Sequence, residues 1–428
     1  MKKIIKKQAV INIGVIGHVA HGKSTIVHSI TGVQTIKFKK EFERNITIKL
    51  GYANAKIFKC KNIQCPRPGC FASTKSIVIN YLFCNQCHYE MQLVRHVSFV
   101  DCPGHEILMA TMLSGASIMD ASLVVIAANE MCPQPQTAEH MISIKIMKLD
   151  KIITIQNKID LVSKKDAIES YQKIKTFIRK ADVKNFPIIP ISIKKKCNID
   201  VLLQKIIYHI PLPIRNFKDV PIVSLIRSFD VNKPGSIFKN IRGGIVGGVV
   251  LSGILCIKDK IEICPGITSK KKNHQVSFFP LRSMIMSLNT EENNLKYAVP
   301  GGLIGIGLNV SPDFSRADRL IGQLLGYRNL LPEVYISITI KYKLFRRLLG
   351  ITDKNFSVSS LYSNEVLMIN IGSSSAGGKI LYTKKNTALI KLTIPLCFKK
   401  DYKITLSRRI HKHWRLIGWG KLIRGKKI

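Results

Sequence analysis

The sequence predicts a doubly wound α/β domain followed by two β-barrels. A buried apolar strand runs into a glycine-rich loop and a helix between residues 9 and 30. Strands and helices then alternate, which is typical of a parallel sheet covered by helices. Further along, short Val, Ile and Leu runs alternate with Gly, Pro, Asn and Asp, which favours barrels. We expect the α/β domain at residues 1–213 and the barrels at residues 219–330 and 331–428.

The chain has 428 residues, enough for several domains with cores of their own. Its 67 Lys and Arg against 26 Asp and Glu give a formal net charge of +41, which favours a nucleic-acid partner. A coding bias toward Lys, Ile and Asn is the alternative source of this charge. The basic start and the apolar run after it imitate a signal peptide. We reject this interpretation, because cleavage would remove the strand that leads into the glycine-rich loop. Since no apolar stretch is long enough to cross a membrane, we expect a cytoplasmic protein with no membrane partner.

The loop at residues 17–24 has the pattern G-x-x-x-x-G-K-S. Its glycines let successive backbone N–H groups face one phosphate, and the helix N-terminus adds partial positive charge. We expect Lys23 to reach the outer phosphates and Ser24 to bind Mg²⁺. The flanking strand and helix argue against a chance Gly/Lys loop. The expected nucleotide contacts are His18, Val19, Ala20, His21, Gly22, Lys23, Ser24 and Thr25.

A second phosphate contact is predicted where the strand at residues 96–100 ends in Asp101-x-x-Gly104. Asp101 is expected to hold Mg²⁺ through water, and the Gly104 N–H is expected to contact the γ-phosphate. His105 follows in a position to orient an attacking water, which makes it the candidate catalytic residue. Thr47, in an extended segment after a polar loop, is a candidate second Mg²⁺ ligand, although a lone Thr is a weak signal.

The most specific motif is the N-K-I-D sequence at residues 157–160, which follows an apolar strand. The Asp160 carboxylate can accept hydrogen bonds from the N1 and N2 donors of guanine, a pair that adenine does not offer. The Lys158 stem can lie over the base, and Asn157 can brace the phosphate loop. Ser192, at the end of a later strand, is a weaker base-side contact. Together with the phosphate motifs, this motif predicts binding of GTP and GDP.

A cysteine-rich insertion spans residues 60–87 and ends in a C-x-x-C pair. Four thiolates in tetrahedral arrangement make a closed, structural zinc site. The spacing between the second and third cysteines is wider than in usual zinc sites, so it does not decide which cysteine is one of the four ligands. Ordinary thiols without metal are the alternative. We favour Cys65, Cys70, Cys84 and Cys87, with Cys60 as the alternative ligand.

The segment at residues 407–420 combines Arg and His with both Trp residues of the chain. Interleaved basic and aromatic residues suit contact with RNA. A final barrel strand with its Trp residues in the core explains the same pattern equally well.

With these motifs in place, the chain resembles the translational GTPases and, within them, the gamma subunit of eukaryotic and archaeal translation initiation factor two. The resemblance covers nearly the whole chain. Many translational GTPases carry Asp where this chain has Ala20, whereas the eukaryotic gamma subunits are similar to this chain there. The most specific segments are residues 43–53, the cysteine insertion, and residues 132–137, 227–235 and 413–420.

This resemblance implies a GTPase that, with GTP bound, carries initiator methionyl-tRNA to the small ribosomal subunit. It implies a heterotrimer with alpha and beta subunits, an activating factor that triggers hydrolysis, and an exchange factor that restores GTP. It also implies a methionyl-tRNA contact at Tyr52, five residues after Thr47. An elongation factor of the Tu type, or its selenocysteine-specific relative, is the alternative, and the cysteine insertion weighs against it. Because every catalytic position is filled, a GTP-binding scaffold that never hydrolyses is disfavoured.

Overall fold

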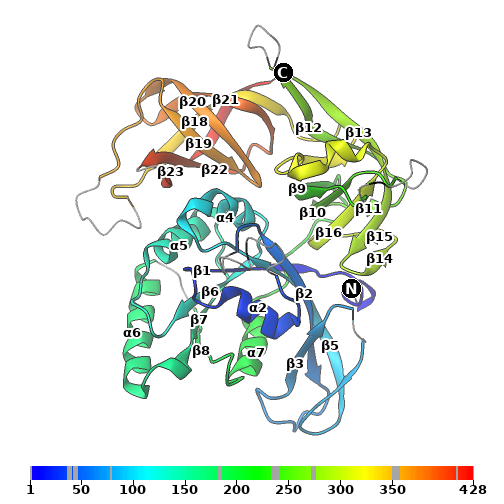
Figure 1. Cartoon of the computed structure of the whole chain (residues 1–428), viewed down its shortest axis with the longest axis vertical. Helices are drawn as coiled ribbons and strands as arrows, with labels where there is room; N and C mark the ends of the chain where they lie inside the picture. The colour runs from blue at the N-terminus through cyan, green and yellow to red at the C-terminus, as the bar shows by residue number, and fades with distance from the viewer. Residues whose placement is uncertain are drawn as a thin grey trace. The chain divides into compact units, whose positions relative to one another are not determined.

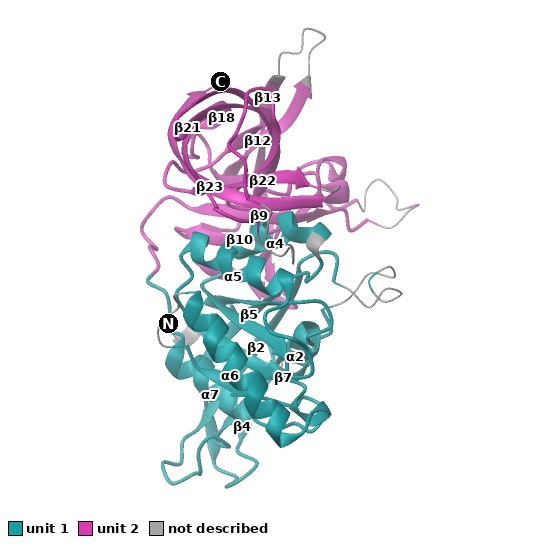
Figure 2. Cartoon of the chain, turned by 90° about the vertical axis from the view of Figure 1, so that its left-hand side faces the viewer, with its two compact units in different colours: residues 1–214, 349–352 teal, residues 215–348, 353–428 magenta. Residues whose placement is uncertain are grey.

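The computed structural model describes residues 2–35, 41, 47–77, 80–181, 186–232, 235, 241–270, 276–348, 357–410 and 413–427. The described residues up to 214 form one compact unit, and those from 215 onward form a second (Figure 2). Parts of four segments singled out above, residues 43–46, 78–79, 233–234 and 411–412, lie outside the described residues.

The first unit is built on an eight-stranded sheet (Figure 1). Its strands are β1 (Ile11–Gly17), β2 (Gly51–Cys60), β3 (Phe71–Lys75), β4 (Leu82–Phe83), β5 (Glu90–Asp101), β6 (Ala121–Ala127), β7 (Ile152–Asn157) and β8 (Ile188–Pro190). The order is β3-β2-β5-β1-β6-β7-β8, with β4 paired to β5. The run from β5 to β8 is parallel, so the carboxyl ends of these strands meet at one edge.

Helices cover both faces of this sheet. They are α1 (Lys2–Ile5), α2 (Lys23–Thr31), α4 (Met109–Ala116), α5 (Pro135–Met147), α6 (Lys164–Lys180) and α7 (Ile199–His209), with short 3₁₀ turns η1 (Glu106–Leu108) and η2 (Ile159–Leu161). Helices α2 and α7 lie on one face, and α4, α5 and α6 lie on the other (Figure 1). Sequence analysis did not single out α6. Its N-cap Ser163 accepts the Asp166 N–H, and its buried face includes Ile174 and Ile178.

The central strands are buried on both faces, which explains their uninterrupted apolar sequence. All seven residues of β1 are buried, as are all seven of β6. Strand β1 ends at Gly17, whose φ of 147° places the backbone against β6. A Cβ on Gly17 would lie 2.3 Å from the Val125 carbonyl oxygen, so only glycine fits where the phosphate loop begins.

The second unit contains two barrels. The strands of the first are β9 (Ile222–Phe229), β10 (Ile245–Ser252), β12 (Lys260–Lys270), β13 (Val276–Thr290), β14 (Asn293–Leu295), β16 (Gly301–Leu308) and β17 (Leu324–Tyr327). Their order is β12-β17-β9-β10-β16-β13-β14, and pairing of β12 with β13 closes the sheet. A separate ribbon pairs β11 (Leu255–Cys256) with β15 (Tyr297–Ala298), and 3₁₀ turns η4 (Pro312–Phe314) and η5 (Arg316–Asp318) precede β17.

The second barrel is closed, in the order β18-β21-β20-β19-β22-β23. Its strands are β18 (Val334–Leu344), β19 (Val366–Ile371), β20 (Ser374–Lys384), β21 (Thr387–Cys397), β22 (Lys403–Ile410) and β23 (His413–Lys427). The predicted fold class, an α/β domain followed by two barrels, is thereby confirmed. Among the described residues, no helix is long and apolar enough to span a membrane.

The basic and aromatic tail forms the end of β22 and the start of β23. The expectation of a final barrel strand is therefore confirmed for its described residues. The accompanying expectation of core Trp residues is wrong, because Trp414 and Trp419 are both partly exposed. The Lys403 ammonium lies 3.6 Å from the centre of the Trp419 ring, a cation–π contact that a core position would not allow.

Candidate functional site

A cavity of about 260 Å³ opens at the carboxyl edge of the parallel strands. Segments that follow β1, β5 and β7 meet there with the segment that precedes β2. Open α/β sheets bind ligands at this edge. The residues that line the cavity are Val19, Ala20, Gly22, Lys23, Ser24, Thr25, Thr47, Gly104, His105 and Lys158, all of them within the motifs predicted from the sequence.

The phosphate loop is braced from the next motif along the sheet. The Asn157 side-chain amide donates to the His21 carbonyl oxygen at 2.9 Å. Gly22, with φ at 90°, begins α2, and a Cβ there would lie 2.4 Å from the same amide nitrogen. The brace and the glycine therefore depend on each other, because a side chain at position 22 would push Asn157 away.

The Lys23 side chain is buried and lies along the loop. Its ammonium donates to the His18 carbonyl oxygen at 2.6 Å. Burial lowers the pKa of Lys23 to about 8, although the nearby Asp101 carboxylate opposes this shift. A phosphate placed beside this ammonium would stabilise its charged form, which burial disfavours.

Three oxygen-bearing side chains gather beside Lys23. The Ser24 and Thr47 hydroxyl oxygens are 3.2 Å apart, and the fully buried Asp101 accepts a hydrogen bond from the Thr35 hydroxyl at 2.7 Å. Burial raises the pKa of Asp101, while hydrogen bonds from Ser24 and Thr35 oppose the shift. Mg²⁺ binds oxygen ligands of this kind, so the donor set fits the ion. Sequence analysis did not identify Thr35.

Sequence analysis also missed Glu41. Its side chain is 2 % exposed, and one carboxylate oxygen accepts the backbone N–H groups of Ile48 and Lys49, both at 3.0 Å. These two residues follow Thr47 directly, so Glu41 fixes the backbone that presents the Thr47 hydroxyl. No spacing rule marks such a residue in a polar loop, and only its burial reveals it.

The two histidines of the loop point away from the cavity. His21 is fully buried, with Nδ1 at 2.9 Å from the Val125 carbonyl oxygen and Nε2 at 3.1 Å from a Glu130 carboxylate oxygen. Burial lowers the pKa of both His18 and His21. Neither residue is among those that line the cavity, and the buried His21 ring is held by its two contacts.

His105 lines the cavity on the side of Gly104. Its Nδ1 accepts the Ile107 backbone N–H at 3.3 Å, which places the proton of a neutral ring on Nε2. To accept a hydrogen bond from water through Nδ1, the side chain must first release Ile107. A Cβ on Gly104 would lie 2.4 Å from the Lys23 ammonium nitrogen, which explains the glycine beside it.

At the base end, Ser192 donates a hydrogen bond of 2.6 Å to the Asp160 carboxylate. This bond is the main cause of a lowered pKa of Asp160. The Ser192 hydroxyl in turn accepts the Lys195 backbone N–H at 3.2 Å. Asp160 is thus oriented and ionised before any ligand arrives. Lys158, with φ at 60°, turns toward the cavity.

The cysteine insertion brings four thiols together. The sulfur atoms of Cys60, Cys65, Cys84 and Cys87 all lie within 4.8 Å of one another. Cys60 and Cys87 are 3.4 Å apart, and Cys65 and Cys84 are 3.7 Å apart. A tetrahedral zinc with bonds of about 2.3 Å separates its sulfur ligands by about 3.8 Å, so the set fits zinc.

Cys70 does not belong to this group. It is buried among the apolar residues of the first unit, and its carbonyl oxygen accepts the Cys60 N–H at 2.9 Å. The favoured set that included Cys70 is therefore replaced by the alternative with Cys60. The reason is geometric, because Cys60 lies opposite Met91 on β5, and Met91 lies opposite Leu82 on β4, the strand that leads directly to Cys84.

Tyr52 lies on β2, opposite Val100 on β5, and is partly buried. It does not line the nucleotide cavity. It is separated from Thr47 by four residues of one continuous described segment.

The fold and the site together define a translational GTPase. The model of the elongation factor Tu GTP-binding domain matches residues 8–212, and that of initiation factor eIF2 gamma, C terminal, matches residues 336–422. The chain belongs to the family of the gamma subunit of eukaryotic translation initiation factor 2.

Two relatives show this family membership over the full chain. Eukaryotic translation initiation factor 2 subunit gamma of Schizosaccharomyces pombe is 55 % identical over 428 residues, covering 99 % of this chain and 96 % of the relative. Eukaryotic translation initiation factor 2 subunit 3 of Drosophila melanogaster is 54 % identical over 432 residues, covering 100 % and 91 %. The chain is accordingly a GTP-binding translation initiation GTPase.

Solved structures of other translational GTPases share the fold. A bacterial selenocysteine-specific elongation factor, EF-Sec, gives a TM-score of 0.69 at 18 % identity, over 98 % of this chain and 59 % of that chain. Elongation factor SelB from Methanococcus maripaludis, in complex with the GTP analogue GppNHp, gives 0.68 at 19 % identity, over 99 % and 80 %. At these identities the likeness concerns the fold alone.

Proposed function

We propose that this chain binds GTP and initiator methionyl-tRNA, delivers the tRNA to the small ribosomal subunit, and hydrolyses GTP on start-codon recognition. The observation that carries the proposal is the contact between Ser24 and Thr47, at 3.2 Å, with Tyr52 on the same segment. A γ-phosphate that orders Thr47 would also order the start of β2. The full-length similarity to initiation factor subunits supports this choice of tRNA.

In this proposal the phosphate loop and Lys23 hold the phosphates, and Asp160 with Ser192 holds the guanine. Ser24, Thr47 and Asp101 would hold Mg²⁺, which neutralises charge on the phosphates when bound. The four thiols of Cys60, Cys65, Cys84 and Cys87 would hold a structural zinc. The partners expected are alpha and beta subunits of the same factor, a GTPase-activating factor and a nucleotide-exchange factor.

His105 is the proposed catalytic residue. Its bond to Ile107 holds it in place without a substrate, so an activator that breaks this bond would free Nδ1 to orient the attacking water. We expect His105→Ala to preserve GTP and tRNA binding and to lower stimulated hydrolysis about 10²- to 10³-fold. Single-turnover hydrolysis with small ribosomal subunits and activator measures this. Unchanged hydrolysis would assign the role to another residue.

The test of the tRNA proposal is a choice between tRNAs. We expect the GTP-bound chain to bind methionyl initiator tRNA and to discriminate against methionyl elongator tRNA in filter binding. Equal binding of both would favour an elongation-type carrier, the alternative function. Failure to bind either tRNA while GTP is retained would separate nucleotide binding from tRNA carriage and would contradict the proposal.

A further inference from the structure

The second barrel carries a hollow that the nucleotide chemistry does not use. Its volume is about 670 Å³, and it is lined by β18, by the turn between β20 and β21, and by β23. Four of its nine lining residues are lysines, Lys341, Lys343, Lys385 and Lys421, and none is acidic. Lys and Arg together make up 67 of 428 residues in the chain, so this concentration exceeds the general bias. We call it the basic hollow.

The register of the barrel sets two pairs across β18 and β23. Lys341 lies directly opposite Lys421, and Lys343 lies opposite Trp419. Like charges placed opposite each other on neighbouring strands are destabilising. All four lysines are exposed, and no carboxylate among the described residues forms an ion pair with them. The charge is therefore available to an anion from solution.

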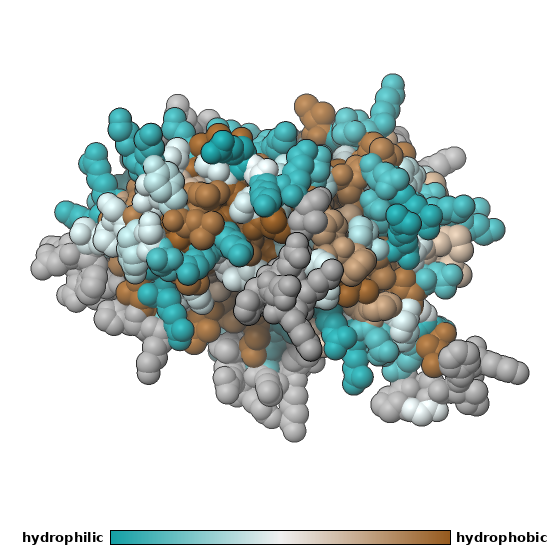
Figure 3. All heavy atoms as spheres, turned by 90° about the horizontal axis from the view of Figure 1, so that it is seen from above, coloured by the Kyte–Doolittle hydropathy of each residue, from teal (hydrophilic) through white to brown (hydrophobic). Residues whose placement is uncertain are grey.

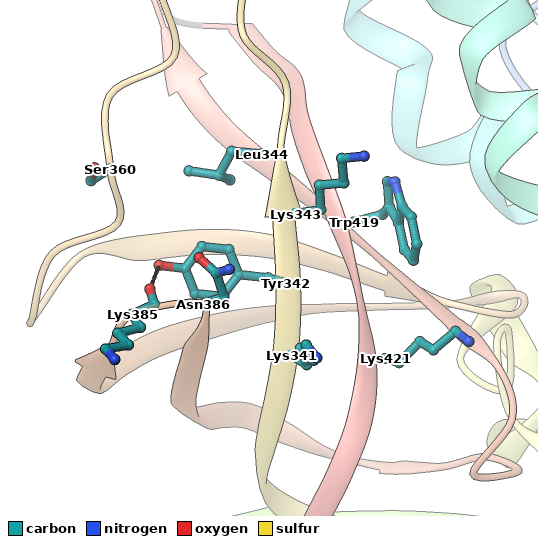
Figure 4. Close-up of a pocket in the computed structure, with 9 residues that line it drawn as sticks. All are labelled: Lys341, Tyr342, Lys343, Leu344, Ser360, Lys385, Asn386, Trp419 and Lys421. Carbon is teal, nitrogen blue, oxygen red and sulfur yellow. Dashed lines mark hydrogen bonds between the residues drawn. The ribbon is translucent and has the colours of Figure 1, made fainter.

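Aromatic residues complete the wall. Tyr342 and Asn386 lie beside Lys385 on one side of β18, whereas the side chains of Lys343 and Trp419 lie on the other side of this strand (Figure 4). The Tyr342 hydroxyl donates to the Lys385 carbonyl oxygen at 3.0 Å, and the Tyr342 N–H donates to Asn386 at 2.8 Å. These bonds hold the turn against β18, so the wall is fixed before a ligand binds.

We propose that the basic hollow binds one or two unpaired nucleotides of RNA. Lysines without counter-ions suit phosphates, and the partly exposed Trp419 indole suits the face of an unstacked base. The volume falls within the range of about 300–1,000 Å³ that is usual for small-ligand pockets, which suits nucleotides better than a double helix. The site belongs to the second unit and is separate from the GTP cavity of the first. An acidic protein segment would satisfy the lysines but leave the Trp419 indole without a role.

The test is fluorescence anisotropy with a 5′-fluorescein-labelled octauridylate and the full chain with GDP bound. We expect binding that weakens with salt, because ammonium–phosphate contacts release counter-ions. Lys341→Ala combined with Lys421→Ala should lower affinity about tenfold and make the salt dependence less steep. The matched control is Lys379→Ala with Lys391→Ala, a second pair of opposed lysines on β20 and β21 outside the hollow, which should change affinity less than twofold.

The aromatic contribution is tested separately. Trp419→Ala should lower affinity about five- to a hundredfold, the scale of one stacked base, and Trp419→Phe should retain most of it. In a Trp414→Phe background, octauridylate should quench the fluorescence of Trp419. The proposal would be overturned if the control lysine pair lost as much affinity as the hollow pair, or if the hollow variants lost none. It would also be overturned if polyglutamate displaced the RNA as effectively as unlabelled octauridylate does. Because the probe has no aminoacyl end and GDP is bound, these outcomes do not bear on GTP-dependent tRNA binding.

Discussion

Asp160 is the residue on which we propose that the choice of base depends. Its carboxylate is oriented by Ser192 at 2.6 Å and is kept ionised by that bond, so it is ready to accept two donors from guanine. Asp160→Asn replaces one acceptor by a donor, which faces a donor of guanine. We expect GTP affinity to fall about ten- to a hundredfold and xanthosine triphosphate to be preferred. Nucleotide titration measures both. Wild-type GTP affinity in this variant would remove Asp160 from base recognition.

Glu41 is expected to act through Thr47. Glu41→Ala removes the acceptor of two backbone N–H groups next to Thr47. In a buried site, the loss of such hydrogen bonds should shift the equilibrium away from this backbone conformation by roughly tenfold or more. The affinity for GppNHp should therefore fall about tenfold while the affinity for GDP stays within twofold. Glu41→Gln, which keeps a carbonyl acceptor, should lose less.

The matched control for Glu41 is Glu169→Ala, which removes an exposed carboxylate on α6. It should change neither affinity. Equal loss of GppNHp and GDP binding in Glu41→Ala would make Glu41 a general support of the fold. Unchanged binding of both would deny it any role at this site.

Some residues of the site could be predicted from the sequence, and others could not. Lys23, Gly104 and Asp160 each belong to a motif at the end of a strand, and a parallel sheet gathers such ends at one edge. Their meeting could therefore be predicted. Thr35 and Glu41 lie outside these motifs and reach the site through contacts that no periodicity encodes.

At the scale of elements, the central strands of the first unit follow from apolar runs, whereas the mostly polar α6 was not found from the sequence. The zinc ligands of the cysteine insertion are less determined by the sequence, because the cysteine spacing leaves the choice between Cys60 and Cys70 open. Strand pairing places Cys60 near the other thiols, since it lies opposite Met91 on β5, and Met91 lies opposite Leu82 on β4, which leads to Cys84. Such a choice depends on strand register, which the cysteine spacing does not contain.

The zinc assignment gives a prediction with a built-in control. Cys60→Ser should abolish stoichiometric zinc, because three thiolates no longer close the site, whereas Cys70→Ser should retain about one zinc per chain. Metal analysis of protein purified without chelator measures this. Loss of zinc from the Cys70 variant alone would restore the set with Cys70, and metal-free wild-type protein would contradict a zinc site altogether.

At the scale of the whole molecule, the excess of positive charge is the dominant property. The sequence has a formal net charge of +41, and many of the side chains that project from the surface in one view are hydrophilic (Figure 3). Charge on this scale favours phosphate contacts in general, so it raises the affinity for any RNA. Selectivity for one tRNA must come from groups that respond to GTP, and Tyr52 is the proposed one.

Tyr52→Ala should lower the affinity of the GTP-bound chain for methionyl initiator tRNA about ten- to a hundredfold, the scale expected for stacking on the terminal adenine. The GDP-bound form should bind weakly with or without Tyr52, because Thr47 then releases the segment that leads to β2. The matched control is Tyr208→Ala, an aromatic residue of the same unit that is 55 % exposed on α7. It should leave tRNA affinity within twofold.

A salt series separates the aromatic contact from the charge. Phosphate contacts weaken as salt rises, so both the wild type and Tyr52→Ala should lose affinity with similar slopes, and the difference between them should persist at high salt. A difference that disappears at high salt would mean that Tyr52→Ala perturbs charged contacts instead of stacking. Equal affinity in the GTP and GDP forms would contradict the switch through Thr47, and indifference to the methionyl group would remove the acceptor-end pocket from the proposal.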